Sequence, residues 1–176
     1  MSLSALSVMV VEDHGFQRRM ALRLLAELGV TEVHHAAAGA AALGQLNVMG
    51  QIPDVVLVDL DMPGMDGIEF IGHVAQRRLA RAVVVVSALD AALLNTVQTM
   101  ARAYGLRVLG SVEKPLTRDK LESVLGRLDE HAGEEQDDGV ADFSLQALSD
   151  ALESGDGKLA RQKAQGHLRS LYKASI

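Results

Sequence analysis

The sequence predicts an α/β protein with a doubly wound parallel sheet of five strands and a short helical C-terminal extension. Strand-like and helix-like segments alternate five times before residue 129. Three of the strand-like segments are apolar on both faces, which is typical of parallel strands covered by helices on both sides. A hydrophobic content of 48% over 176 residues is ample for a globular core.

The first two strand–helix units open the chain. Residues 6–11 form an apolar run rich in β-branched side chains that ends at two acids, which predicts a short strand. In residues 16–28 large apolar side chains recur at every fourth position, and Gly29 follows, as expected of a helix and its end. A weaker strand is predicted at 31–36 and an alanine-rich helix at 38–46.

The next two units contain the most apolar strands. Pro53 introduces a continuous apolar strand at 55–58, and a helical pattern occupies 67–77. A second strand without any polar residue is predicted at 82–86, followed by a long helix at 90–104. Strands of this composition are expected in the middle of a sheet that is covered on both faces.

The fifth unit is followed by a change in composition. A strand at 107–112 and a helix at 117–128 complete a domain that we assign to residues 1–128. Seven acids and two glycines in residues 129–142 predict an acidic linker. Residues 143–176 carry two thin apolar stripes at helical spacing, too few large side chains for a core of their own. We interpret them as a helical extension or as a truncated output region.

Composition excludes several classes of function. No apolar stretch approaches the roughly 18 residues of a membrane span. The N-terminus lacks the basic flank of a signal peptide, so a cytoplasmic location and no membrane partner are expected. Cysteine is absent, which excludes disulfides and thiolate metal sites. Aromatic residues make up 3%, and residues 1–156 are strongly acidic, so no nucleic-acid partner is expected.

Charged and hydroxyl side chains follow four of the predicted strands: Glu12 and Asp13 the first, Asp59 the third, Ser87 the fourth and Lys114 the fifth. In an open α/β sheet, ligands bind at the carboxyl ends of the strands. Clustered carboxylates need a cation, and hard oxygen ligands suit Mg²⁺. A lysine and a hydroxyl beside that ion would hold the other oxygens of a phosphoryl group. The pattern therefore predicts a site that moves phosphate onto or off a carboxylate.

Four motifs in a fixed order make this pattern specific: the Glu12-Asp13 pair, Asp59 in VVLVDLDMPGMDG, Ser87 in VVVVSA and Lys114 in EKP. With them the chain resembles the response regulator receiver domains of two-component signalling. The resemblance implies a flavodoxin-like (βα)5 fold. It also implies that Asp59 accepts phosphate from a histidine kinase or a histidine phosphotransfer protein, in a Mg²⁺-dependent reaction that switches the conformation of the domain.

The resemblance further implies a role for each site residue. Asp59 is the phosphoacceptor, Ser87 senses the phosphoryl group and Lys114 pairs with it. The implied Mg²⁺ ligands are Asp13 and Asp59, with Glu12 through water and Asp61 through its backbone carbonyl. Asp66 is expected to be a turn residue rather than a ligand.

Three features depart from the common receiver pattern, and one of them is the additional carboxylate of Asp61 beside Asp59, expected to influence dephosphorylation. The position three before Lys114, often aromatic in the family, is Ser111, so the signal is expected to leave by another route. A long fourth helix and the EDHGFQR start are similar to receivers attached to EAL-type cyclic-di-GMP phosphodiesterases.

Two other functions stay open at this point. The chain could be the N-terminal regulatory part of a cyclic-di-GMP phosphodiesterase, although the catalytic signatures of that enzyme are absent from the 176 residues. It could also be a metal-dependent phosphohydrolase with an aspartate nucleophile, since Asp59-Leu60-Asp61 fits a D-x-D pattern. We interpret the chain as a signalling switch that catalyses its own phosphorylation and is not otherwise an enzyme. A homodimer is one assembly that we consider.

Overall fold

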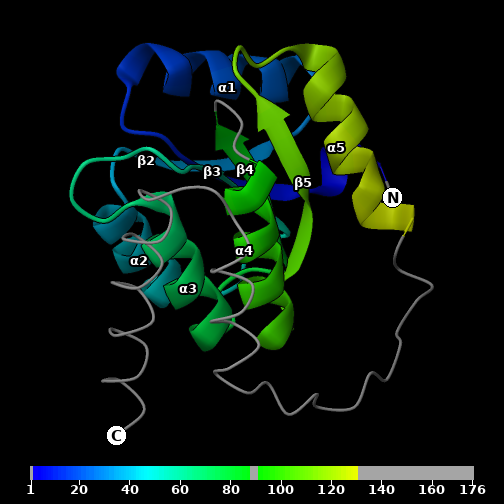
Figure 1. Ribbon diagram of the computed structural model, residues 1–176. Coiled ribbons are helices and arrows are strands. Elements are labelled where there is room, and N and C mark those ends of the chain that lie inside the picture. Colours follow the sequence, from blue (N-terminus) through cyan, green and yellow to red (C-terminus); the bar gives the residue numbers. More distant parts are fainter. Residues whose placement is uncertain (1, 88–90, 131–176) are drawn as a thin grey trace, which may run out of the picture.

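The computed structural model describes residues 2–87 and 91–130. Figure 1 shows one central sheet with helices packed on both of its faces. The strands are β1 (Ser7–Val11), β2 (Glu32–Ala36), β3 (Val55–Asp59), β4 (Ala82–Ser87) and β5 (Arg107–Glu113). The helices are α1 (Gly15–Glu27), α2 (Gly39–Val48), α3 (Gly67–Arg77), α4 (Ala91–Ala103) and α5 (Arg118–Glu130), after a short 3₁₀ helix, η1 (Leu3–Ala5). Residues 131–142 of the predicted linker and the whole predicted extension lie outside the described residues.

The sheet confirms the predicted fold class. All four strand pairs are parallel, and the strand order is β2-β1-β3-β4-β5. The chain moves outward from β1 to β2 and then returns past β1 to β3, so the direction of winding reverses between β1 and β3. The carboxyl ends of these two strands therefore border the crevice in which such sheets bind ligands.

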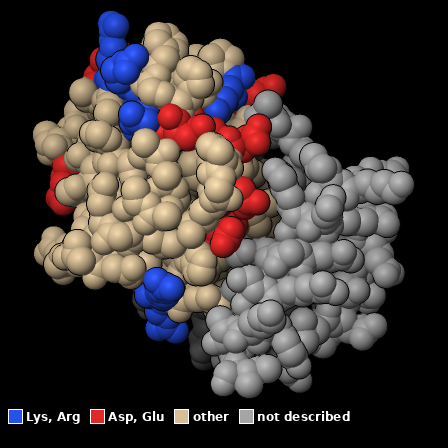
Figure 2. Space-filling model, turned by 90° about the vertical axis from the view of Figure 1, so that its left-hand side faces the viewer, with Lys and Arg blue, Asp and Glu red and all other residues tan. Residues whose placement is uncertain are grey.

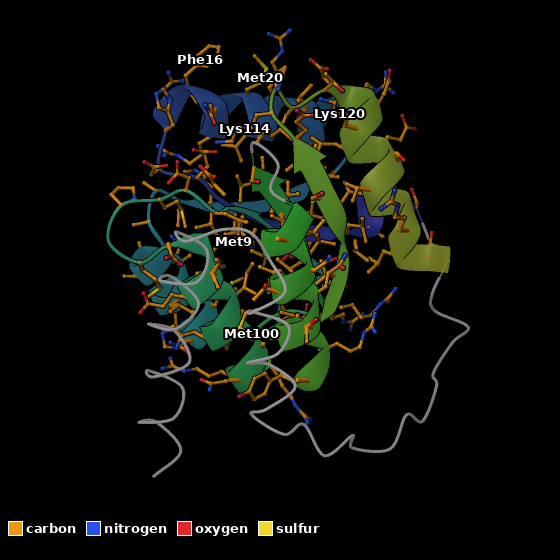
Figure 3. The ribbon with its side chains drawn as sticks, in the orientation of Figure 1. Met9, Phe16, Met20, Met100, Lys114 and Lys120 are labelled. Atoms are coloured by element: carbon orange, nitrogen blue, oxygen red, sulfur yellow. The ribbon has the colours of Figure 1, made fainter. Side chains whose placement is uncertain are left out.

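The core consists of two apolar layers, one on each face of the sheet. Successive β1 residues alternate between them: Met9 packs in the layer beneath α2, α3 and α4, and Val10 in the layer beneath α1 and α5. All five residues of β3 are buried. In Figure 3, Met9 lies within the fold, while Phe16 projects from the first turn of α1 and is 61% exposed. The two layers hold the strand ends in fixed positions.

The helix boundaries differ from the sequence predictions by a few residues. The fifth helix continues to Glu130, two residues into the segment predicted as linker. Its last turn is held against the sheet, because the Arg107 guanidinium donates a hydrogen bond of 3.3 Å to the carbonyl of Leu128. The sequence pattern did not predict η1. None of the helices in the described ranges is long and apolar enough to cross a bilayer.

Five described residues have a positive φ in the left-handed range, and four of them are glycines (Gly29, Gly64, Gly105 and Gly110). The fifth is Arg78, which ends α3 with φ 53° and ψ 48°. For a residue with a Cβ this conformation costs roughly 1–2 kcal/mol relative to right-handed backbone. Glycine is the residue usually found at this position of a helix end.

Candidate functional site

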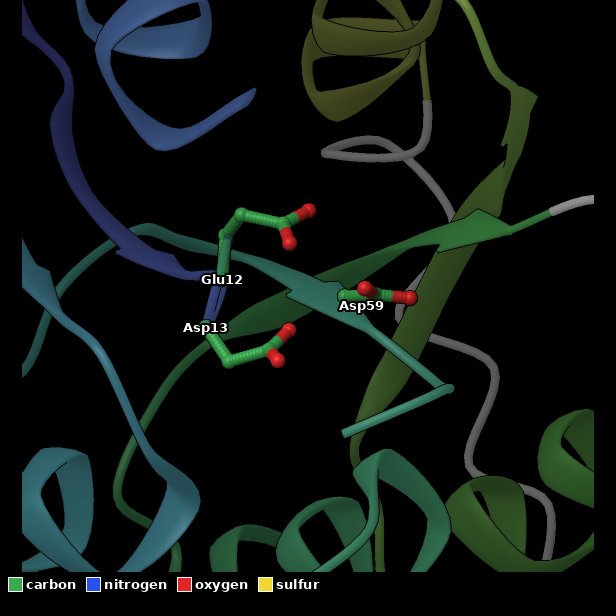
Figure 4. Close-up of side chains that lie close together, drawn as sticks. All are labelled: Glu12, Asp13 and Asp59. Atoms are coloured by element: carbon green, nitrogen blue, oxygen red, sulfur yellow. The ribbon is translucent and has the colours of Figure 1, made fainter. Parts of the chain in front are cut away.

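Three carboxylates meet at the crevice between β1 and β3. Glu12 and Asp13 follow β1, and Asp59 is the last residue of β3. One oxygen from each carboxylate lies within 4.8 Å of the others, and Figure 4 shows the three side chains around a common space. Glu12 and Asp59 are only 5% and 4% exposed. Two buried carboxylates at this separation repel each other, and a nearby cation or protonation of one of them relieves the repulsion.

Lys114 supplies a positive charge to this cluster. Its Nζ lies 2.9 Å from Oδ2 of Asp59 and 3.2 Å from Oε2 of Glu12. The lysine follows β5, which pairs with β4 in parallel so that Ser87 is opposite Glu113. This register brings the residue after β5 to the edge of the sheet where β1 and β3 end. The ammonium thus bridges carboxylates from two different strands.

Backbone N–H groups hold the carboxylates in place. The N–H of His14 donates to Oε1 of Glu12 at 3.1 Å, and the N–H of Asp61 donates to Oδ1 of Asp59 at 3.0 Å. The guanidinium of Arg18 donates to the carbonyl of Glu12 at 2.8 Å. The sequence did not predict either contact. The His14 contact uses only the backbone N–H, and an arginine in the first turn of a helix carries no sequence signal that it will bond to the Glu12 carbonyl.

The other predicted site residues lie at the border of the cluster. Ser87 ends β4, is partly buried and accepts the Lys114 backbone N–H through its own carbonyl at 3.4 Å. No hydrogen bond between described residues joins the Ser87 hydroxyl to the carboxylates. The side chain of Asp61 is exposed and is not one of the three clustered carboxylates. Asp66 caps α3, accepting the N–H of Glu69 at 2.9 Å, as expected of a residue outside the ligand set.

The start of α3 packs directly on the backbone that carries Asp59. The N–H of Gly67 donates to the carbonyl of Leu60 at 3.1 Å. A Cβ at Gly67 would overlap the Asp59 carbonyl oxygen and lie 2.6 Å from the Cα of Leu60. Because both neighbours are backbone atoms of the strand end, they cannot rotate away. Only glycine permits this close approach.

We therefore expect Gly67→Ala to destabilise the fold by roughly 2–3 kcal/mol, as overpacking against a fixed backbone does. The matched control is Gly44→Ala in α2, where a Cβ would meet nothing within 4 Å. That variant should gain roughly 0.5–1 kcal/mol, because alanine is the better helix former. Urea denaturation followed by circular dichroism measures both. Equal stability of the two variants would contradict the close approach at Gly67.

Electrostatics shift two groups in the cluster. Burial raises the pKa of Glu12 above 4.5, and the negative charge of Asp59 adds to the shift; the His14 N–H and Lys114 oppose it. Burial works to lower the pKa of Lys114, but the hydrogen bond and negative charge of Asp59, together with Glu12, outweigh it and raise that pKa above 10.5. The ammonium is therefore charged at neutral pH.

The shift of Glu12 predicts a pH dependence of stability in the metal-free protein. Between pH 4.5 and the raised folded-state pKa, the folded chain binds more protons than the unfolded chain. The contribution of Glu12 to stability is therefore largest below pH 4.5 and is lost as the pH rises through the folded-state pKa. The free energy of unfolding is measured in urea with EDTA from pH 4 to 7. Glu12→Gln should remove the part of its pH dependence that comes from Glu12. Glu122→Gln, at an exposed position of α5, should leave the pH dependence unchanged.

The donor set fits a hard divalent cation. Carboxylate oxygens and a nearby backbone carbonyl are the ligands that Mg²⁺ takes, in combination with water and phosphate oxygens. Asp13 is only partly buried, so the cluster opens to solvent on its side. The arrangement can hold a cation beside Asp59 and leaves one lysine to meet an anion.

Comparisons with known proteins identify relatives of this chain. The sequence model of the response regulator receiver domain matches residues 8–126. Cyclic di-GMP phosphodiesterase RocR of Pseudomonas aeruginosa is 31% identical over 125 residues, which are 71% of this chain and 32% of RocR. The chain thus spans about a third of that relative.

Solved structures show the same fold. The chemotaxis protein CheY4 of Vibrio cholerae aligns with a TM-score of 0.58 and 26% identity, over 70% of this chain and 99% of that one. The receiver domain of the putative response regulator NarL of Mycobacterium tuberculosis aligns with a TM-score of 0.56 and 31% identity, over 70% and 96% of the two chains.

Proposed function

The chain belongs to the response regulator receiver domain family, and we propose that Asp59 is its phosphoacceptor. The observation that carries the proposal is the position of the Asp59 carboxylate, which contacts the ammonium of Lys114 and lies beside the carboxylates of Glu12 and Asp13. A buried carboxylate between a cation-binding cluster and a fixed lysine is suited to accept a phosphoryl group.

In the proposed reaction, an Asp59 carboxylate oxygen attacks the phosphorus of a phosphohistidine on the donor protein. The new P–O bond forms as the P–N bond breaks, and the donor imidazole leaves with the electron pair and takes up a proton. Mg²⁺, held by Asp13 and Asp59, by Glu12 through water and by the carbonyl of Asp61, would neutralise charge on the phosphoryl oxygens.

Two side chains of the chain itself complete the proposed site. Lys114 would pair with one phosphoryl oxygen, which draws its ammonium away from the Glu12 carboxylate that it contacts at 3.2 Å. The hydroxyl of Ser87, at the end of the neighbouring strand, would donate to another oxygen. Movement of these two groups is the proposed first step of the conformational switch.

The partners follow from the same proposal. The proposed phosphate donor is a histidine kinase or a histidine phosphotransfer protein. Because such donors act in the cytoplasm, a cytoplasmic location is proposed too. A homodimer is one proposed assembly. The proposed organisation is a receiver at residues 1–128, whose last helix runs on to Glu130, followed by the acidic linker up to residue 142 and an extension at 143–176. The similarity to RocR favours a second candidate, the regulatory part of a cyclic-di-GMP phosphodiesterase. A phosphohydrolase is less well supported, because the second acid of the D-x-D pattern, Asp61, is exposed outside the cluster.

The proposal is tested by incubating the chain with acetyl phosphate, with and without Mg²⁺, and measuring its intact mass. One phosphate per chain is expected, only in the presence of Mg²⁺, and it should be released by hydroxylamine, as acyl phosphates are. Release of inorganic phosphate from a generic phosphate ester, without a phosphorylated chain, would instead support the phosphohydrolase.

A further inference from the structure

Arginines gather at the edge of the sheet opposite to the phosphoacceptor, where the strands begin. We name this surface the arginine edge; it consists of Arg77, Arg78, Arg81, Arg102 and Arg107. Arg77 ends α3, and Arg78 and Arg81 lie in the connection from α3 to β4. Arg102 lies in the last turn of α4, and Arg107 begins β5. These connections are neighbours, because Ala82 pairs with Arg107 in the sheet and α3 packs beside α4. In Figure 1 they lie at the lower ends of α3 and α4, and Figure 2 shows basic side chains at the lower end of the part of the chain that the structure describes.

Three of these guanidinium groups have no partner within the described residues. Arg81 forms an ion pair of 3.3 Å with Asp54, and Arg107 donates to the carbonyl of Leu128. Arg77, Arg78 and Arg102 are exposed, and no ion pair or side-chain hydrogen bond joins them to another described residue. Their combined charge makes this surface complementary to an anion.

The backbone at Arg78 gives an independent reason to regard the edge as a binding surface. Every other described residue in the left-handed range is glycine, and Arg78 alone carries a side chain there. A strained backbone kept at one position motivates a search for what its side chain does. Here the residue with the left-handed backbone carries one of the three exposed guanidinium groups of the arginine edge.

The chain supplies an anionic segment that starts beside this surface. The last turn of α5 is held next to the start of β5 by the bond from Arg107 to Leu128, so α5 ends close to Arg107 of the arginine edge. Residues 131–142 contain five acids and neither lysine nor arginine (Glu134, Glu135, Asp137, Asp138 and Asp142). An extended chain spans up to about 3.5 Å per residue, which is ample for these acids to reach α4 and α3.

We propose that the acidic segment 134–142 docks on the arginine edge of its own chain, with Arg77, Arg78 and Arg102 as its principal contacts. Attachment through α5 gives the segment a high effective concentration, so contacts between exposed charges that would be weak between separate molecules become populated. Docking ties residues 143–176 to the end of the domain opposite Asp59. The contact is electrostatic and is weakened by salt.

The absence of cysteine allows a direct test in the full chain. A nitroxide spin label is attached to Gln136→Cys, and amide signals are recorded by ¹⁵N NMR at low salt. We expect a loss of signal at Arg78, Arg81 and Gly105, and none at Phe16 at the other end of the molecule. The signals should recover in 500 mM NaCl.

A matched pair of variants separates charge from fold. Arg77→Gln combined with Arg78→Gly removes two charges and relieves the left-handed arginine, so it should raise the unfolding midpoint while restoring the amide signals of Arg81 and Gly105. Arg19→Gln combined with Arg23→Gln, on α1, should leave the loss of signal unchanged. Three results would overturn the proposal: no signal loss at the arginine edge, signal loss that survives both salt and the first variant, or signal loss that appears only between labelled and unlabelled copies of the chain.

Discussion

Asp59→Asn is expected to abolish phosphate incorporation from acetyl phosphate, the largest effect of any single substitution in the site. The asparagine has nearly the same shape and can still accept the N–H of Asp61 through its amide oxygen. It has no anionic oxygen to attack phosphorus, so the loss is chemical rather than geometric. Intact-mass spectrometry after incubation with acetyl phosphate and Mg²⁺ measures it.

Asp61→Asn is the matched control. It removes a carboxylate two residues away that is exposed and outside the cluster, while its backbone N–H still supports Asp59. We expect this variant to incorporate one phosphate per chain. Phosphate that is still incorporated by Asp59→Asn would contradict the proposed phosphoacceptor. A lower free energy of unfolding of both variants in urea would show that the substitutions affect folding instead.

The second large effect concerns Mg²⁺ affinity, in which Asp13 and Lys114 are expected to act in opposite directions. Asp13→Asn removes a ligand and should weaken Mg²⁺ binding at least about tenfold. Lys114→Met removes an ammonium that already contacts Asp59 and Glu12, the same carboxylates that a cation needs. Relief of repulsion between the lysine and the ion should tighten Mg²⁺ binding at least about fivefold, since two like unit charges 4 Å apart repel by about 1 kcal/mol even in water.

Isothermal titration of each variant with MgCl₂ measures the two affinities, and phosphorylation by acetyl phosphate is followed in parallel. Lys114→Met should bind Mg²⁺ well and yet be phosphorylated poorly, because the phosphoryl group loses its positive partner. Arg23→Met, at an exposed position of α1 where the guanidinium pairs with Glu27, serves as the control for loss of a surface cation. Equal weakening of Mg²⁺ binding in the Asp13 and Lys114 variants would refute the division of roles.

The sheet and the strand-end residues could be predicted from sequence because their signal is local. Residues 55–58 and 82–86 are uninterrupted apolar runs, which only a strand covered on both faces explains in a chain of this size. Once the strands are placed, a parallel sheet brings the residues that follow them to one edge. Asp59 and Lys114 could therefore be assigned to one site without knowledge of any contact.

Contacts that depend on three-dimensional packing could not be predicted in this way. The bridge from Lys114 to Glu12 depends on the relative height of the ends of β1 and β5, which are not neighbours in the sheet. The need for glycine at residue 67 appears only when α3 is laid on the end of β3. The left-handed backbone of Arg78 carries no sequence signal, since the usual marker at a helix end is glycine.

The position of β3 has a consequence for how a signal can travel. This strand is buried along its whole length and is hydrogen-bonded on one side to β1 and on the other to β4. Its amide protons should exchange with deuterium only when the whole domain unfolds, in both states of Asp59. The proposed phosphoacceptor is thus anchored on a strand that is buried along its whole length, and differences in hydrogen exchange between the two states should be confined to the segments that follow β4 and β5.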